Sequence, residues 1–196
     1  MWRLLDGHQD LTHADDCDCL MRGLVVVIGV SGLLALACVG RAHGHPHAVG
    51  RDPGGLMEAV LAVHNEVRGA ANLPRLNWSD ALARRAAQWA TYLAARQLVA
   101  HSETNMAEGE NIWVGTAGAF SYELMLRDWA DEARFFRAGR FPHISTTGNW
   151  EDVGHYSQMI WRGSRHVGCA VATGDGWDYL VCRYDVQANL FGQMPY

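Results

Sequence analysis

Residues 154–161 read Gly-His-Tyr-Ser-Gln-Met-Ile-Trp, so an imidazole, two hydroxyls and an amide stand beside aliphatic residues and a tryptophan. Composition alone does not place so many polar groups in an apolar segment. Histidine changes its charge near neutral pH, and it serves both as a proton carrier and as a metal ligand. His155 is therefore the first candidate for chemistry, and we predict that a short helix carries it.

Further short motifs lie elsewhere in the chain, at His64-Asn-Glu-Val-Arg68, His101-Ser102, Glu110-Asn111, Trp129-Ala-Asp-Glu132 and Cys182-Arg-Tyr184. Together with residues 154–161, and in the same order, they resemble the signatures of the CAP superfamily (cysteine-rich secretory, antigen 5 and pathogenesis-related 1 proteins). The resemblance covers roughly residues 56 to 189, and the chain is identified as a bacterial-type member. The last signature differs, because Val186 and Ala188 stand where the family usually has Pro and Gly before an Asn. That difference concerns the C-terminal turn.

The resemblance implies that four side chains meet in one cleft: His101, Glu110, Glu132 and His155. Spacing alone does not show this, because the four lie in distant segments. Such a set suits Zn²⁺ binding, with His101 and His155 as ligands, a general acid–base pair, or a hydrogen-bonded group that shapes a groove. Members of the family recurrently bind lipids or sterols, and no reaction is agreed for them.

Two serines, Ser102 and Ser157, follow or nearly follow the candidate histidines in sequence. Close neighbours on a helix or strand usually point apart, and the chain has no Gly-x-Ser-x-Gly elbow and no His-Glu-x-x-His motif. We therefore predict a non-enzymatic binding module that requires no cofactor, with Zn²⁺ as a metal it could hold. The alternative is a metal-assisted hydrolase with Glu110 or Glu132 as its base.

Helices and strands must position the residues of the predicted cleft. Apolar residues at helical spacing predict three helices, marked by Leu56, Val60, Val63 and Val67, by Leu82, Ala86, Trp89 and Leu93, and by Tyr122, Met125, Leu126, Trp129 and Ala133. Ser79 or Asp80 can cap the second helix. His64, Asn65 and Arg68 share the other side of the first helix, and we interpret His64 as a solvated or capping residue.

Strands are predicted at residues 112–114, 167–172 and 179–184. The resemblance implies an α/β fold, a three-layer α-β-α sandwich around a small antiparallel sheet. Asp175-Gly176 is a strong hairpin signal, and a two-residue turn there places Cys169 opposite Cys182. The Cα separation of about 4.5 Å in a non-hydrogen-bonded pair lies within disulfide range, so we predict a Cys169–Cys182 disulfide.

The N-terminus predicts export. Residues 1–42 form a signal-peptide region, in which Arg22 precedes an apolar run from Leu24 to Val39. That run is shorter than the roughly 20 residues that span a bilayer, and acidic residues before it suggest Met21 as the true start. Cys38 weakly resembles a bacterial lipoprotein site, and its lipidation stays open. We expect a linker at 43–55, the domain at 56–189 and a tail at 190–196.

The length and net charge of the chain limit the kinds of partner that it can bind. The chain has 196 residues, 49% of them hydrophobic, and a net charge of −5. These values indicate one folded domain and no basic surface for nucleic acid. We expect an extracellular or periplasmic protein without a transmembrane span in its mature form. Its expected partner is a small hydrophobic ligand or a component of the cell envelope.

Overall fold

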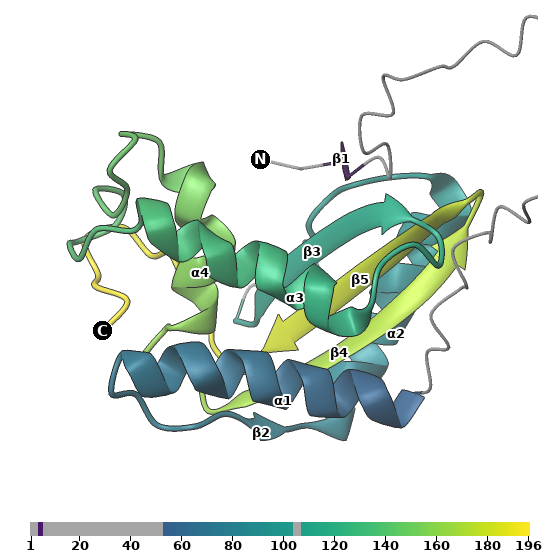
Figure 1. Cartoon of the computed structure of the whole chain (residues 1–196), viewed down its shortest axis with the longest axis horizontal. Coiled ribbons are helices and arrows are strands. Elements are labelled where there is room, and N and C mark those ends of the chain that lie inside the picture. Colours follow the sequence, from purple (N-terminus) through teal and green to yellow (C-terminus); the bar gives the residue numbers. More distant parts are fainter. Residues whose placement is uncertain (1–3, 6–52, 104–106) are drawn as a thin grey trace, which may run out of the picture. The chain divides into compact units, whose positions relative to one another are not determined.

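The computed structural model describes residues 4–5, 53–103 and 107–196 (Figure 1). The apolar run from Leu24 to Val39, Cys38 and most of the predicted linker lie outside these residues. Within the described ranges, no helix has the length and apolar character needed to cross a membrane.

A mixed sheet forms the centre of the fold. Its strand order is β1 (Leu4–Leu5), β3 (Gly109–Thr116), β5 (Trp177–Tyr184), β4 (His166–Gly174) and β2 (Asn77–Trp78). The three central strands are antiparallel, as predicted, whereas both short outer strands pair in parallel with their neighbours. Parallel pairing fits β2 because the whole of helix α2 separates it from later strands.

The β4–β5 hairpin confirms the predicted turn and disulfide. Asp175 and Gly176 have φ angles of 50° and 80°, as a type I′ turn requires. The turn pairs Gly174 with Trp177 and therefore places Cys169 opposite Cys182. These cysteines form a disulfide with a Cα–Cα distance of 4.1 Å.

Helices cover both faces of the sheet and confirm the three-layer architecture. Helices α1 (Pro53–Ala70) and α3 (Tyr122–Ala130) lie in front of the sheet in Figure 1, and α2 (Asp80–Arg96) lies behind it. Two 3₁₀ helices, η1 (Asp131–Phe135) and η2 (Trp150–Val153), precede the short helix α4. The predicted helix around His155 is α4, which spans Gly154–Met159.

Alternate residues of β5 divide the apolar interior into two cores. Leu180, Cys182 and Tyr184 pack on the face that α1 and α3 cover. Tyr179 and Val181 face α2 and pack with its buried alanines and Leu93. This two-residue period is the property of a strand that makes a three-layer fold possible.

Serine caps begin two helices, and the cap at Ser79 confirms one of the two predicted candidates. Ser79 Oγ accepts a hydrogen bond from Leu82 N, and Ser121 Oγ accepts one from Leu124 N. The third helix ends earlier than predicted, at Ala130, and Ala133 lies exposed on η1. The chain continues there as η1, and Glu132 of η1 contacts the start of α4.

The polar side of α1 is buried, so the interpretation of His64 as solvated was wrong. His64, Asn65 and Arg68 are 0%, 6% and 0% exposed. His64 bonds to Val60 O and to the Tyr184 hydroxyl, at 2.8 Å each. Burial is the main cause that lowers the pKa of His64 to about 4 and also raises that of Tyr184. The helix is covered on this side because α4 and the following segment pack over it.

Candidate functional site

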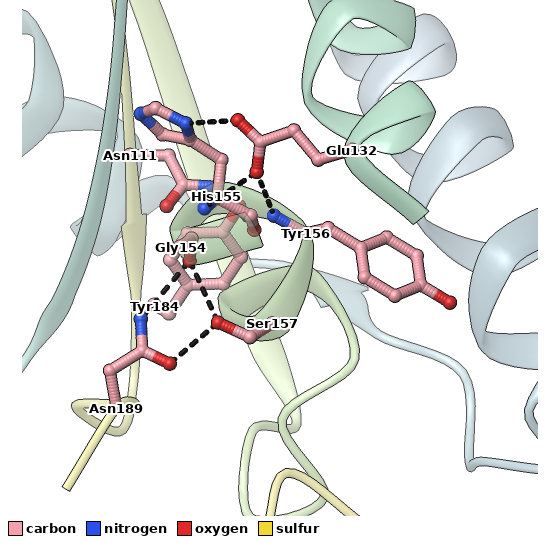
Figure 2. A network of polar contacts seen from close by, with 8 residues as sticks. All are labelled: Asn111, Glu132, Gly154, His155, Tyr156, Ser157, Tyr184 and Asn189. Atoms are coloured by element: carbon pink, nitrogen blue, oxygen red, sulfur yellow. Dashed lines mark hydrogen bonds and ion pairs between the residues drawn. The ribbon is translucent and has the colours of Figure 1, made fainter. Parts of the chain in front are cut away.

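His155 and Glu132 form a tightly oriented pair at the start of α4 (Figure 2). His155 Nδ1 lies 2.7 Å from Glu132 Oε1, and Glu132 Oε2 accepts hydrogen bonds of 3.0 Å from the backbone N–H groups of His155 and Tyr156. The first N–H groups of a helix lack partners within it and favour a negative charge. Glu132 therefore both caps α4 and fixes the orientation of the His155 imidazole. The Trp129 ring stacks on His155, with centroids 5.7 Å apart.

His101 and Glu110 form a second pair of the same kind. His101 Nδ1 lies 2.7 Å from Glu110 Oε1, which also accepts a 3.0 Å hydrogen bond from Ser102 N. The second oxygen of Glu110 lies 2.9 Å from the Arg183 guanidinium. The Glu110 side chain is 7% exposed and the His101 side chain 58%, so a buried carboxylate orients an accessible imidazole.

The two pairs line different hollows. Glu132 and His155 line a small hollow of about 30 Å³, together with Trp129 and residues of η2. His101 and Glu110 line a larger one of about 350 Å³. Among the described residues, no group of three or more His, Cys, Asp or Glu side chains is placed to hold a metal ion. Convergence of all four side chains on one ligand stays a prediction.

Ser157 is a structural residue. It is 0% exposed, and its hydroxyl lies 2.6 Å from Asn189 Oδ1 and 3.0 Å from the Gly154 carbonyl (Figure 2). Asn189 Nδ2 also donates to Gly154 O, at 3.0 Å. These bonds leave Ser157 no access to a substrate. They also connect the C-terminal segment to α4 despite the altered signature.

Arg183 is a site residue that sequence reasoning missed. Its side chain is 5% exposed and lies between two glutamates, 2.9 Å from Glu110 and 3.8 Å from Glu108. The register of β3 against β5 places Arg183 directly opposite Glu110. The two-residue period puts Arg183 on the face opposite to Cys182 and Tyr184, but its partner depends on a register that no local signal gives.

A third histidine–carboxylate pair, also not predicted, lies at the start of β4. His166 Nδ1 is 2.9 Å from Asp185 Oδ2. Burial opposes the charge of Asp185, but hydrogen bonds from Arg165 N and His166 outweigh it, so the pKa of Asp185 is lowered. His166 lines neither the hollow of His155 nor that of His101.

Residues 61–184 match the CAP family, described as the cysteine-rich secretory protein family. The mouse protein "Peptidase inhibitor R3HDML" is 31% identical over an alignment of 161 positions that covers 71% of this chain and 62% of that protein. Tobacco "Pathogenesis-related protein 1A" is 33% identical over 138 residues, which are 69% of this chain and 78% of that protein. The match thus spans less than two thirds of the mouse protein's length.

Two solved structures share the fold. NaASP2 with Zn²⁺ has a TM-score of 0.59 and 22% identity, over 75% of this chain and 90% of that one. Hookworm platelet inhibitor has a TM-score of 0.56 and 20% identity, over 74% and 76%. The sequence relatives described above come from an animal and a plant, so the bacterial-type assignment gains no support from them. The family match and the motifs around both histidine–glutamate pairs lead to one conclusion: the chain belongs to the cysteine-rich secretory protein (CAP) family.

Proposed function

We propose that this protein is an exported, non-enzymatic binding module whose ligand site is built on its two histidine–glutamate pairs. One observation carries the proposal: both carboxylates are already engaged in orienting an imidazole and in binding local donors. Glu132 accepts from His155 Nδ1 and from two backbone N–H groups. Glu110 accepts from His101 Nδ1 and Ser102 N and pairs with Arg183. Carboxylates so committed position a binding group and are poorly placed to act as general bases.

Zn²⁺ is the metal that the donor set suits. Metal-binding histidines usually give their other ring nitrogen to a carboxylate, which fixes the ring, and His155 has this arrangement. Figure 2 shows its second nitrogen on the far side of the ring from Glu132. We propose His155 as the first protein ligand and His101 as the second. Because no larger acidic or histidine cluster lies among the described residues, water or an organic ligand would complete the coordination.

An exported protein with this fold would meet a small hydrophobic ligand or a component of the cell envelope. The family is described as secretory, and the disulfide fits an oxidising compartment. A separate hollow of about 500 Å³ lies along β4, with lining residues from α1, α2 and α3. Most of its lining is apolar, including Leu56, Ala83, Ala87, Tyr122 and Val171, and Asp80 and Arg84 are its charged residues. Its apolar walls suit a small hydrophobic molecule.

Calorimetric titration with Zn²⁺ at neutral pH tests the metal site, and His166→Ala provides the matched control. We expect His155→Ala to abolish most of the uptake, and Glu132→Gln to weaken it by about 10–100-fold, the usual effect of removing an orienting partner. His166→Ala removes an equally oriented imidazole from outside both hollows and should change nothing. Equal losses in His155→Ala and His166→Ala would contradict the assignment.

The background for these titrations must lack other metal-binding histidines. His43, His45 and His47 alternate before the domain, and such tracts bind metals on their own. All three are therefore replaced by alanine in every variant and in the reference protein. Binding should also weaken as the pH falls, because the imidazoles must lose their protons to coordinate.

The rival function is a hydrolase that uses the same residues. General acid–base groups typically contribute 10²–10⁴-fold in rate, so a hydrolase should lose most activity in both His155→Ala and Glu110→Gln. We expect no turnover in a panel of ester and peptide substrates, with or without Zn²⁺. Turnover that disappears in both variants, while circular dichroism stays unchanged, would establish the enzyme instead.

A further inference from the structure

The hollow beside His101 has an aromatic wall. Phe141, Trp150 and Phe191 line it together with Glu110 and Arg183. Phe141 is buried and makes edge-to-face contacts with Trp150 and Phe191, at centroid distances of 4.9 and 5.2 Å. Trp150 is 37% exposed and Phe191 is 81% exposed. Two accessible aromatic rings therefore contact a buried one.

The backbone holds Phe191 in this exposed position. Gly192 N donates to Phe141 O at 2.9 Å, and Phe141 N donates to Gln193 O at 2.8 Å. The guanidinium of Arg140 donates to Gly192 O at 2.7 Å, and Gly192 itself adopts a φ of 77°. An aromatic ring that is anchored on both sides and left 81% exposed contributes little to the core. Its position is explained if it contacts a ligand.

Each carboxylate that lines the hollow is paired with a guanidinium. Arg183, which also lines it, lies between Glu108 and Glu110, and Arg85, which lines a different hollow, lies 2.6 Å from Glu108. Two carboxylates and two guanidiniums leave no excess charge to attract an anionic head group or an organic cation. A purely hydrocarbon ligand is also disfavoured, because it would cover these polar groups without bonding to them. The best match is a neutral ligand rich in hydrogen-bonding groups.

Some polar atoms of the same charged groups make no hydrogen bond within the protein. Among the described residues, Glu108 Oε2 and Arg183 Nε are buried without a hydrogen-bond partner, and Glu110 Oε2 has only its 2.9 Å ion pair with Arg183. A hydroxyl group can donate to a carboxylate and accept from a guanidinium. Adjacent hydroxyls on one molecule would therefore complement a Glu–Arg pair.

We propose that this hollow binds one or two units of a neutral saccharide. A sugar ring presents C–H bonds on its face, and these pack against the electron-rich face of an aromatic ring. The sugar face lies against Trp150 and Phe191, and the hydroxyls point toward the Glu110–Arg183 pair. The volume of about 350 Å³ is at the lower end for small-molecule sites. The inference rests on the proposed function, since it names the ligand class for the hollow of the His101–Glu110 pair.

Calorimetry with the mature protein and four hexasaccharides tests the assignment. The neutral probes are the hexamers of β-1,4-glucose, β-1,3-glucose and β-1,4-N-acetylglucosamine, and the charged probe is hexagalacturonate. We expect saturable binding of at least one neutral hexamer, and binding of hexagalacturonate at least about tenfold weaker. No saturable binding of any neutral hexamer up to about 10 mM, or a preference for the charged probe, would overturn the proposal.

Aromatic variants show where the sugar binds. Trp150→Ala and Phe191→Ala should each weaken binding at least about fivefold, the lower end for loss of one stacking contact. Phe191 is so exposed that its replacement should not disturb folding. Tyr92→Ala is the control, because Tyr92 is 39% exposed but lies on α2 and not in this hollow. Unchanged affinity in both Trp150→Ala and Phe191→Ala would place the sugar elsewhere and refute the site.

Failure of the saccharide proposal and failure of the proposed function would give different experimental results. Absence of saccharide binding would leave the Zn²⁺ titrations and the substrate panel unaffected. Release of shorter oligosaccharides, detected by chromatography after incubation, would overturn the non-enzymatic function and leave the saccharide site in place.

Discussion

Replacing Arg68 with methionine should destabilise the domain strongly, because this residue connects α1 to the segment that follows α4. Its guanidinium donates to the carbonyls of Pro74, Met159, Trp161 and Ser164 at 2.7–3.1 Å. Arg68 is 0% exposed, and burial lowers its pKa to about 10. Methionine retains most of the volume and removes every donor.

The magnitude follows from the carbonyls that lose their partner. Each buried polar group left unsatisfied costs about 1–3 kcal/mol, and three of these carbonyls lie together at residues 159–164. Release of the buried charge offsets part of this loss. We therefore expect the free energy of unfolding to fall by about 3–5 kcal/mol, the lower part of the roughly 3–9 kcal/mol that three unsatisfied carbonyls would cost.

Urea denaturation followed by circular dichroism measures this loss, and Arg127→Met is the matched control. Arg127 pairs with Glu66 at 2.7 Å on the surface, where the two side chains are 36% and 61% exposed. Exposed ion pairs contribute about 0–1 kcal/mol, so the control should unfold almost like the parent. If Arg68→Met costs no more than Arg127→Met, the three buried hydrogen bonds to residues 159–164 do not hold that segment against α1.

Three further perturbations probe other parts of the fold. Since burial lowers the pKa of His64 from 6.5 to about 4, the unfolded state binds more protons between these values. Stability should then be full above pH 6.5 and fall by about 3 kcal/mol toward pH 4, and a His64→Gln variant with the same pH profile would contradict this. Replacing both Cys169 and Cys182 with alanine should lower the free energy of unfolding by about 3 kcal/mol, and thiol counting on the denatured parent should detect neither cysteine. Gly168→Ala should cost about 1–3 kcal/mol in thermal or urea unfolding, because its Cβ would collide with the backbone of Ser79 and Ala83. Gly69→Ala, in open space on α1, should instead stabilise by about 0.5–1 kcal/mol, and equal effects of the two alanines would argue against close packing of α2 on β4.

Local sequence patterns were sufficient to predict much of the fold. The two-residue turn at Asp175-Gly176 and the period of a strand were sufficient to pair Cys169 with Cys182. Likewise, apolar spacing located α2 and α3, and a capping residue located the start of α2. These features depend on residues close in sequence, whose geometry the backbone dictates. The motifs then implied the three-layer sandwich through their resemblance to a family.

Tertiary packing decided the partners of the polar residues. The pairing of His155 with Glu132 spans 23 positions and depends on how η1 meets α4. The pairing of Arg183 with Glu110 depends on the register between β3 and β5. His64 lies on what the apolar stripe marks as the outer side of α1, yet it is 0% exposed because another layer covers it. Periodicity tells which face of one element is apolar, but whether its polar face meets water or another element depends on how the layers close around it.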